Sequence, residues 1–127
     1  MKARVLVVDD SKLARIVVGK AISALRPDWE RVEASNAEQA LELLANCPVD
    51  VALLDYNMPG KNGLELAAEL RALHPTMPIA LITANVQDEI MAAATSLNAV
   101  FVSKPITEDG LRPFLASVDA TLRAGNK

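Results

Sequence analysis

The chain has 127 residues, a formal net charge of -3, 51% hydrophobic residues and only 3% aromatic residues. This length fits one domain with a single core, which must be aliphatic because aromatic residues are so few. The acidic balance argues against DNA or an anionic membrane as the main partner, since both attract a concentrated basic surface. The single cysteine, Cys47, cannot form an internal disulfide. The start of the chain reads as neither a signal peptide nor a membrane span, so a cytoplasmic domain is the default expectation.

Five short apolar runs predict five β-strands. They are Val5–Val8, Val32–Ala34, Val49–Leu54, Ile79–Ile82 and Val100–Val102. The first, third and fourth runs are almost continuously apolar, which is typical of strands covered on both faces of a parallel sheet.

Helical periodicity fills the stretches between these runs. Apolar residues recur three and four positions apart over residues 13–25, 37–44, 66–73, 86–97 and 111–122, which gives each segment one apolar face. Asn36 and Gln39 predict a capping box at the start of the second helix. The His74–Pro75 pair predicts the end of the third, because the residue before proline avoids helical angles.

Two residues carry local expectations outside this pattern. Pro113 conflicts with the last helical stripe unless that helix starts near Asp109 or Gly110, and the sequence leaves this question open. Trp29 is expected to be a partly covered ring at the surface.

The elements alternate as strand and helix five times along the chain. Such alternation predicts an α/β fold with parallel strands, right-handed crossovers and helices on both faces of the sheet. The pattern fills the chain, so we expect a single domain over residues 1–127 without a separate output domain.

Polar residues follow four of the predicted strands. In an open parallel sheet ligands bind beyond the carboxyl ends of the strands, so these residues are expected to converge at one edge. They are Asp9 and Asp10 after the first run, Asp55 after the third, Thr83 after the fourth, and Ser103 and Lys104 after the fifth.

Three clustered carboxylates repel one another unless a cation joins them. Mg²⁺ is the expected cation because it takes oxygen ligands and combines one or two carboxylates with waters and phosphate oxygens. Zinc would need a cluster of cysteine and histidine that this sequence lacks. A carboxylate that faces a phosphoryl donor can act as a nucleophile and form an aspartyl phosphate. Lys104 and Thr83 would then contact the remaining phosphoryl oxygens.

Four segments, taken in order, resemble the signature set of response-regulator receiver domains, above all those of the stand-alone chemotaxis (CheY-like) type. They are VLVVDDS (5–11), LLDYNMPGKNG (53–63), LITA (81–84) and VSKP (102–105). The resemblance covers nearly the whole chain. It implies a flavodoxin-like, doubly wound, five-stranded parallel sheet in the order 2-1-3-4-5 with five helices, an order for which chemotaxis receivers are a standard example.

The resemblance also implies which residues hold the cation and accept the phosphoryl group. Asp55 would be the phosphoacceptor and a Mg²⁺ ligand. Asp10 would bind Mg²⁺ directly, Asp9 mostly through water, and Asn57 would contribute its backbone carbonyl.

The remaining residues at this edge would stabilise the phosphoryl group or report its presence. Lys104 would pair with Asp55 and then with the phosphoryl group, and its bond to Pro105 would be cis, which proline makes accessible. Thr83 would be the switch hydroxyl, with Ala84 as its small neighbour. Phe101 would be the switch aromatic residue, although it lacks a hydroxyl.

The implied function is that of a phospho-receiver in two-component signal transduction. The donor would be the phosphohistidine of a sensor histidine kinase or phosphotransfer protein, and the chain would catalyse only its own phosphorylation and dephosphorylation. Phosphorylation would draw Thr83 inward and let Phe101 move. The face formed by the last two helices and the strand between them would then bind a protein partner in trans. Lys61 is expected to add a mobile cation near the site.

Simpler interpretations stay open for several of these residues. Asp10 or Ser11 could be a plain N-cap of the first helix, and Thr83 a cap of the helix that follows it. Phe101 could be an ordinary core residue.

Three other classes of protein compete with the receiver interpretation. A haloacid-dehalogenase-like phosphatase requires Asp-x-Asp after the first strand, where this chain has Asp9-Asp10-Ser11. A flavin-binding module requires a phosphate loop rich in Ser, Thr or Gly there, and two acids would repel the phosphate. A degenerate receiver that serves only for docking would be favoured if any of Asp55, Thr83 or Lys104 were missing.

Overall fold

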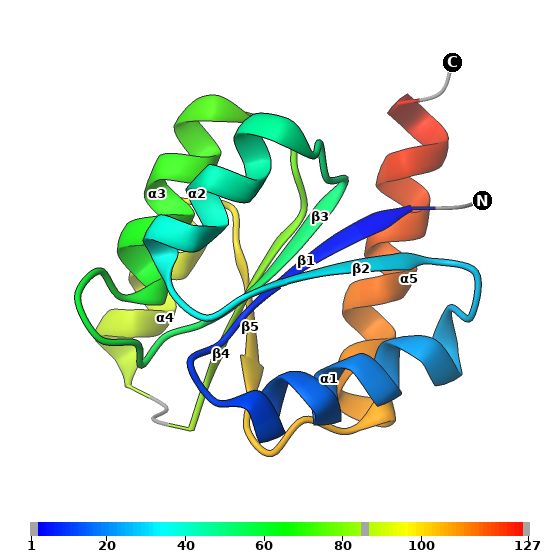
Figure 1. Cartoon of the computed structure of the whole chain (residues 1–127), viewed down its shortest axis with the longest axis horizontal. Helices are drawn as coiled ribbons and strands as arrows, with labels where there is room; N and C mark the ends of the chain where they lie inside the picture. Colours follow the sequence, from blue (N-terminus) through cyan, green and yellow to red (C-terminus); the bar gives the residue numbers. More distant parts are fainter. Residues whose placement is uncertain (1–2, 85–86, 126–127) are drawn as a thin grey trace.

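Within residues 3–84 and 87–125, which the computed structural model describes, five strands form one parallel sheet (Figure 1). The strands are β1 (Arg4–Val8), β2 (Glu30–Ala34), β3 (Val51–Asp55), β4 (Ile79–Thr83) and β5 (Val100–Ser103). Their order is β2-β1-β3-β4-β5, and all four pairings are parallel. The predicted strands and the strand order are therefore confirmed, with small shifts at some strand ends.

Five helices lie in the described part of the chain. They are α1 (Lys12–Leu25), α2 (Ala37–Asn46), α3 (Gly63–Leu73), α4 (Asp88–Ser96) and α5 (Glu108–Gly125). Helices α1 and α5 cover one face of the sheet, and α2, α3 and α4 cover the other (Figure 1), so the doubly wound α/β fold is confirmed. The third helix stops before the His74–Pro75 pair, as predicted. Val86, the first residue of the apolar stripe predicted over residues 86–97, lies outside the described residues.

The two faces of the sheet form two aliphatic cores. Leu6 and Leu54 pack with the residues of α2, α3 and α4, whereas Val7 and Leu53 pack with those of α1 and α5. Every residue of β3 and β4 is buried, which explains why their apolar runs are continuous rather than alternating. None of the helices in residues 3–84 and 87–125 combines the length and apolar character that a membrane span requires.

The expectation for Trp29 is wrong. Its side chain is only 7% exposed and belongs to the core beneath α1 and α5. The backbone N–H of Trp29 donates to the carbonyl of Arg26, so a tight turn after α1 brings the ring inward. The Arg26 guanidinium carbon lies 5.9 Å from the centre of the ring.

Local hydrogen bonds set where α2 and α3 begin. Asn36 accepts from the N–H of Gln39 at 2.8 Å, as predicted, but the Gln39 side chain accepts from Ser35 rather than from Asn36. A complete capping box is instead present at α3, between Asn62 and Glu65. This box starts α3 directly after the loop that follows β3.

The last helix begins too early for Pro113 to lie in its first turn, where proline is tolerated. Thr107 accepts from the N–H of Gly110 at 3.0 Å, and α5 starts at Glu108. Pro113 therefore lies in the second turn, inside the helix, where it supplies no N–H for the carbonyl of Asp109.

Candidate functional site

Four parallel strands bring the predicted site residues to one edge of the sheet. Val8 is in register with Leu54, and Asp55 with Ile82. The carboxyl ends of these strands consequently end side by side. Asp9 and Asp10 follow β1, Asp55 ends β3, Thr83 ends β4, and Lys104 follows β5.

Asp9, Asp10 and Asp55 form a single acidic cluster. Each offers one carboxylate oxygen, and these three oxygens all lie within 4.8 Å of one another. Asp9 and Asp55 are 3% and 2% exposed, whereas Asp10 is exposed. Asp55 Oδ1 lies 3.0 Å from Lys104 Nζ and accepts no other hydrogen bond from the described residues. A set of hard carboxylate oxygen donors fits Mg²⁺ rather than zinc.

Lys104 supplies the positive charge closest to these acids. Its Nζ lies 3.0 Å from Asp55 Oδ1 and 3.6 Å from Asp9 Oδ2. The backbone N–H of Lys104 donates to the carbonyl of Thr83 at 3.0 Å, and the peptide bond between Lys104 and Pro105 is cis. One lysine therefore faces two buried carboxylates.

The electrostatics of the cluster follow from this burial. Burial raises the pKa of Asp55 above its ordinary value, and the nearby Asp9 raises it further, while Lys104 opposes both effects. Burial alone would lower the pKa of Lys104, but Asp55 and Asp9 outweigh burial and raise it. The negative charge at this edge exceeds what Lys104 neutralises, so a further cation is favoured here.

The loop after Asp55 depends on Gly63, a residue for which the sequence predicted no role. The N–H of Gly63 donates to the carbonyl of Tyr56 at 3.0 Å. A Cβ at position 63 would lie 2.2 Å from the Asp55 carbonyl oxygen and 2.9 Å from the Tyr56 Cα. Only glycine lets α3 begin so close to the end of β3. The signal in the sequence that could have revealed this role was a glycine just before the helix predicted over residues 66–73.

The other predicted residues lie on or directly after β4, on β5 and in the loop after β3. Thr83 is fully buried, and Ala84 directly after it is exposed. Asn57 is exposed in the loop after β3. Phe101 is partly buried and packs against the core formed with α2, α3 and α4.

One hydrogen bond settles one of the open interpretations, and an ion pair places Lys61. The N-cap of α1 is Ser11, whose Oγ accepts from the N–H of Ala14 at 3.2 Å, so Asp10 is not needed as a cap. Lys61, which was expected to be a mobile cation near the site, has its Nζ 2.5 Å from Glu69 Oε2 on α3.

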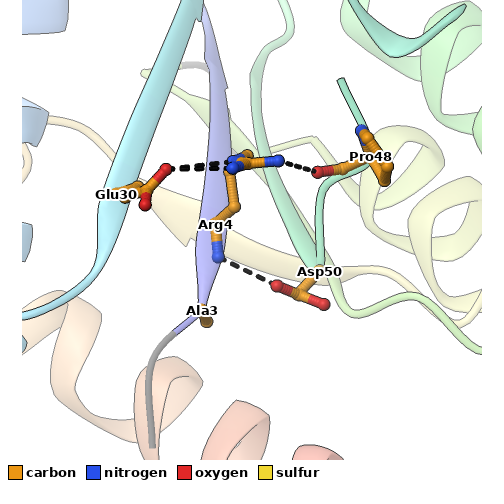
Figure 2. Close-up of a pocket in the computed structure, with 5 residues that line it drawn as sticks. All are labelled: Ala3, Arg4, Glu30, Pro48 and Asp50. Atoms are coloured by element: carbon orange, nitrogen blue, oxygen red, sulfur yellow. Dashed lines mark hydrogen bonds and ion pairs between the residues drawn. The ribbon is translucent and has the colours of Figure 1, made fainter. Parts of the chain in front are cut away.

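A second pocket, of about 380 Å³, lies at the amino ends of the strands (Figure 2). Its charges satisfy one another: the Arg4 guanidinium donates to Glu30 and to the carbonyl of Pro48, each at 3.1 Å, and Asp50 accepts from the Arg4 N–H at 2.9 Å. This arrangement links the amino ends of β1 and β2 and pairs the charges of Arg4, Glu30 and Asp50 with one another.

Comparison with known proteins favours a receiver domain over the phosphatase and flavin-binding classes. The family described as the response regulator receiver domain matches residues 5–116. The chain belongs to this family. Its acidic cluster, lysine and buried threonine thus lie in a receiver domain of two-component signalling.

Individual relatives place this receiver domain in both long and short chains. The positive alginate biosynthesis regulatory protein of Pseudomonas aeruginosa is 38% identical over 111 residues, which cover 84% of this chain and 43% of that protein. A cyclic di-GMP phosphodiesterase of Thermotoga maritima is 33% identical over 109 residues, 85% of this chain and 28% of that protein. The chain thus spans less than half the length of these relatives. The chemotaxis protein CheY4 of Vibrio cholerae has a TM-score of 0.83 at 26% identity, over 93% of this chain and 99% of that one.

Proposed function

We propose that Asp55 of this receiver domain accepts a phosphoryl group from the phosphohistidine of a sensor kinase or phosphotransfer protein. The observation that carries the proposal is the environment of Asp55. Its carboxylate is buried, and Lys104 Nζ lies 3.0 Å from Oδ1. A nucleophile that is held in place and partly neutralised suits phosphoryl transfer, which needs mainly positioning and charge compensation.

In the proposed reaction an Asp55 carboxylate oxygen attacks the phosphorus atom. An oxygen–phosphorus bond forms while the bond between phosphorus and the imidazole nitrogen breaks. The electron pair of the broken bond stays on that nitrogen, which is the leaving group. Lys104 then contacts a phosphoryl oxygen in place of the carboxylate oxygen it faces now. Hydrolysis of the aspartyl phosphate returns Asp55, so self-phosphorylation and dephosphorylation are the reactions proposed for this chain.

The carboxylates of Asp9, Asp10 and Asp55 would hold the Mg²⁺ ion, with the backbone carbonyl of Asn57. The proximity of the three carboxylate oxygens supports this assignment. When bound, Mg²⁺ neutralises phosphoryl oxygens. Burial of Asp9 and Asp55 keeps their charges in a region of low polarity, where a cation interacts with them strongly.

A groove of about 240 Å³ beside Lys104 supports a protein as the donor. Its lining combines Asp9 and Lys104 with apolar residues of α1 and of the loop before α5, including Leu13 and Val17. Leu13 is 70% exposed and Val17 41% exposed. A protein donor would cover this apolar surface while it presents its histidine to Asp55.

The proposed output is a change of the face formed by α4, β5 and α5. Thr83 ends β4 beside β5, and Phe101 lies on β5, the edge strand of the sheet. Phosphorylation would draw the Thr83 hydroxyl toward the phosphoryl group and let the Phe101 ring repack. Met91 and Val100 expose apolar surface on this face, at 39% and 41%, which suits a protein partner in trans.

The test is transfer of labelled phosphate from a purified phosphohistidine protein in the presence of Mg²⁺. Asp55→Asn should abolish labelling, and EDTA should abolish it in the wild type. Asp50→Asn is the matched control, because Asp50 is an exposed acid at the opposite end of the same strand, and it should label normally. Labelling of Asp55→Asn at the wild-type rate would refute the assignment. Repeated turnover of small phosphate esters would favour the phosphatase class instead.

A further inference from the structure

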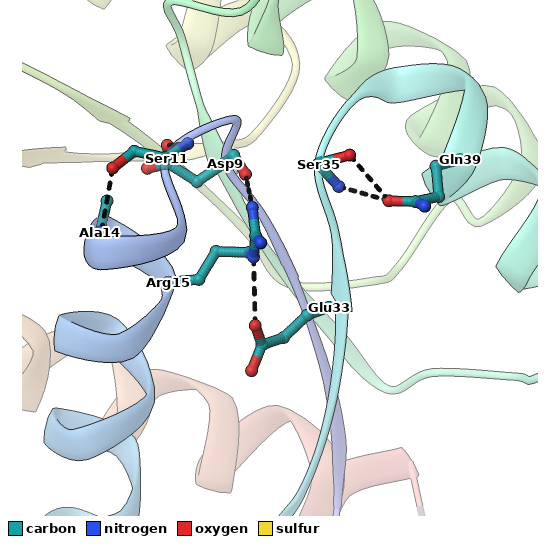
Figure 3. A network of polar contacts seen from close by, with 7 residues as sticks. All are labelled: Asp9, Ser11, Ala14, Arg15, Glu33, Ser35 and Gln39. Carbon is teal, nitrogen blue, oxygen red and sulfur yellow. Dashed lines mark hydrogen bonds and ion pairs between the residues drawn. The ribbon is translucent and has the colours of Figure 1, made fainter.

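Arg15 lies on α1 beside the acidic cluster and contacts the backbone at the end of β1 (Figure 3). Its Nη1 donates to the carbonyl oxygen of Asp9 at 2.6 Å, and its Nε donates to Glu33 Oε1 on β2 at 3.1 Å. The Arg15 side chain is only 17% exposed. One guanidinium therefore links α1 to β2 and to the backbone of Asp9, which follows β1.

The contact with Asp9 controls the direction in which Asp10 leaves the backbone. The carbonyl of Asp9 and the N–H of Asp10 belong to one planar peptide unit. When Arg15 holds that carbonyl, the orientation of the whole unit is held, and with it the position of the Asp10 Cα. The hydrogen bond from Arg15 is thus made to the peptide unit that links Asp9 and Asp10.

Asp10 depends on this backbone more than Asp9 does. The Asp9 carboxylate has partners of its own, since it accepts from the Ser11 N–H at 2.9 Å and lies 3.6 Å from Lys104 Nζ. For the exposed Asp10 carboxylate, the described residues provide no hydrogen bond and no ion pair. Its place beside Asp9 and Asp55 therefore depends on the backbone that sets its Cα and on its own side-chain rotamer.

The choice of acceptor by Arg15 also preserves the cluster. A guanidinium near carboxylates commonly pairs with them in a bidentate manner. Here Arg15 pairs with Glu33, outside the cluster, and takes the main-chain carbonyl of Asp9. The carboxylate oxygens of Asp9, Asp10 and Asp55 are consequently left for a cation.

We propose that Arg15 is a positioning residue for the divalent cation: it fixes the Asp9–Asp10 peptide so that the Asp10 carboxylate meets those of Asp9 and Asp55. This inference rests on the proposed Mg²⁺-dependent function. It differs from a purely structural role, in which Arg15 would only fasten α1 to β2 through Glu33.

The direct test is the Mg²⁺ dissociation constant of the full chain, measured by calorimetry for the wild type and for Arg15→Gln. Loss of a residue that orients metal ligands weakens metal affinity by about tenfold or more, so the dissociation constant should rise by about tenfold. Thermal stability is recorded in parallel.

Arg4→Gln is the matched control. Arg4 also joins a carboxylate of β2, Glu30, to a backbone carbonyl, that of Pro48, but it does so at the opposite end of the sheet (Figure 2). Both variants should lose stability, and only Arg15→Gln should lose Mg²⁺ affinity. A similar rise in the dissociation constant for both variants would refute the proposal.

Glu33→Gln keeps the test decisive if Arg15→Gln does not fold. It leaves Arg15 in place but weakens its anchor, so a rise of about threefold in the dissociation constant is expected. Mg²⁺ affinity that stays within about twofold of wild type in the folded variant overturns the positioning role. Failure of the wild type to bind Mg²⁺ is a separate result, visible without any variant, and would overturn the proposed function itself.

Discussion

Replacing Gly63 by alanine tests how closely α3 is set against the end of β3. An added Cβ would lie 2.2 Å from the carbonyl oxygen of Asp55, 2.8 Å from its carbonyl carbon and 2.9 Å from the Cα of Tyr56. Carbon atoms in contact are ordinarily about 3.5 Å or more apart. The first turn of α3 or the backbone of Asp55 must therefore move by roughly 1 Å, and all the atoms involved are main-chain atoms that cannot rotate away.

The expected cost follows from this forced shift. Overpacking of a tight site costs about 1–3 kcal/mol, and a clash with backbone belongs at the upper end of that range. Alanine recovers part of the loss through its better helix propensity, which is worth at most about 1 kcal/mol. We expect a net loss of about 2 kcal/mol in the free energy of unfolding and a Tm lower by roughly 8 °C. Phosphoryl labelling should also slow, by up to about a hundredfold if Asp55 itself is displaced.

Urea and thermal unfolding measure the first effect, and the labelling assay measures the second. Gly19→Ala is the control, because a Cβ there would meet only the flexible end of Arg31, at 3.3 Å, in the middle of α1. That variant should be neutral or more stable by up to about 1 kcal/mol. Equal stability and equal labelling of the Gly63 and Gly19 variants would show that α3 is not held as closely as argued here.

Two further predictions concern charged groups. Burial raises the pKa of Asp55 above 3.8, so a carbon-13 NMR titration of its carboxyl group without metal should give a midpoint above that value, and Lys104→Met should raise it further. Because the folded state raises the pKa of Asp55, protonated Asp55 stabilises the fold fully at a pH below its unfolded pKa. This contribution to the free energy of unfolding is lost as the pH rises through the folded pKa. An NMR midpoint at or below 3.8 would contradict the raised pKa. Arg71→Met should cost about 2 kcal/mol in urea unfolding, because Arg71 donates to the carbonyls of Leu97 and Met77, each at 2.7 Å, and a loss below about 0.5 kcal/mol would show that water replaces these bonds.

The sequence predicted the framework of the fold because the framework depends on local pattern. Continuous apolar runs indicated buried parallel strands, and helical spacing indicated the layers that cover them. The residues after the runs, such as Asp55 and Lys104, were recognisable because every strand of a parallel sheet ends at the same edge. The strand order came from the resemblance to receiver domains, since periodicity does not say which strands are neighbours.

Local signals were also read incompletely where a neighbouring residue competes. Gln39 has the position for a capping box with Asn36, yet its side chain bonds one residue earlier, to Ser35. The sequence suggests that Lys61 is a free cation in the loop, but its side chain pairs with that of Glu69 on α3. In both cases the partner is set by where the side chains point, which the spacing of residues does not specify.

By itself the sequence determined the fold class, the edge of the sheet where polar residues gather, and the family. Only the tertiary structure decided that Lys104 faces both Asp9 and Asp55 and that Trp29 is buried. It also decided that Arg15 donates to the peptide carbonyl between Asp9 and Asp10. The physical reason is that periodicity reports which face of an element is apolar, whereas these contacts join elements far apart in the chain. Their distances are fixed only when the helices pack on the sheet.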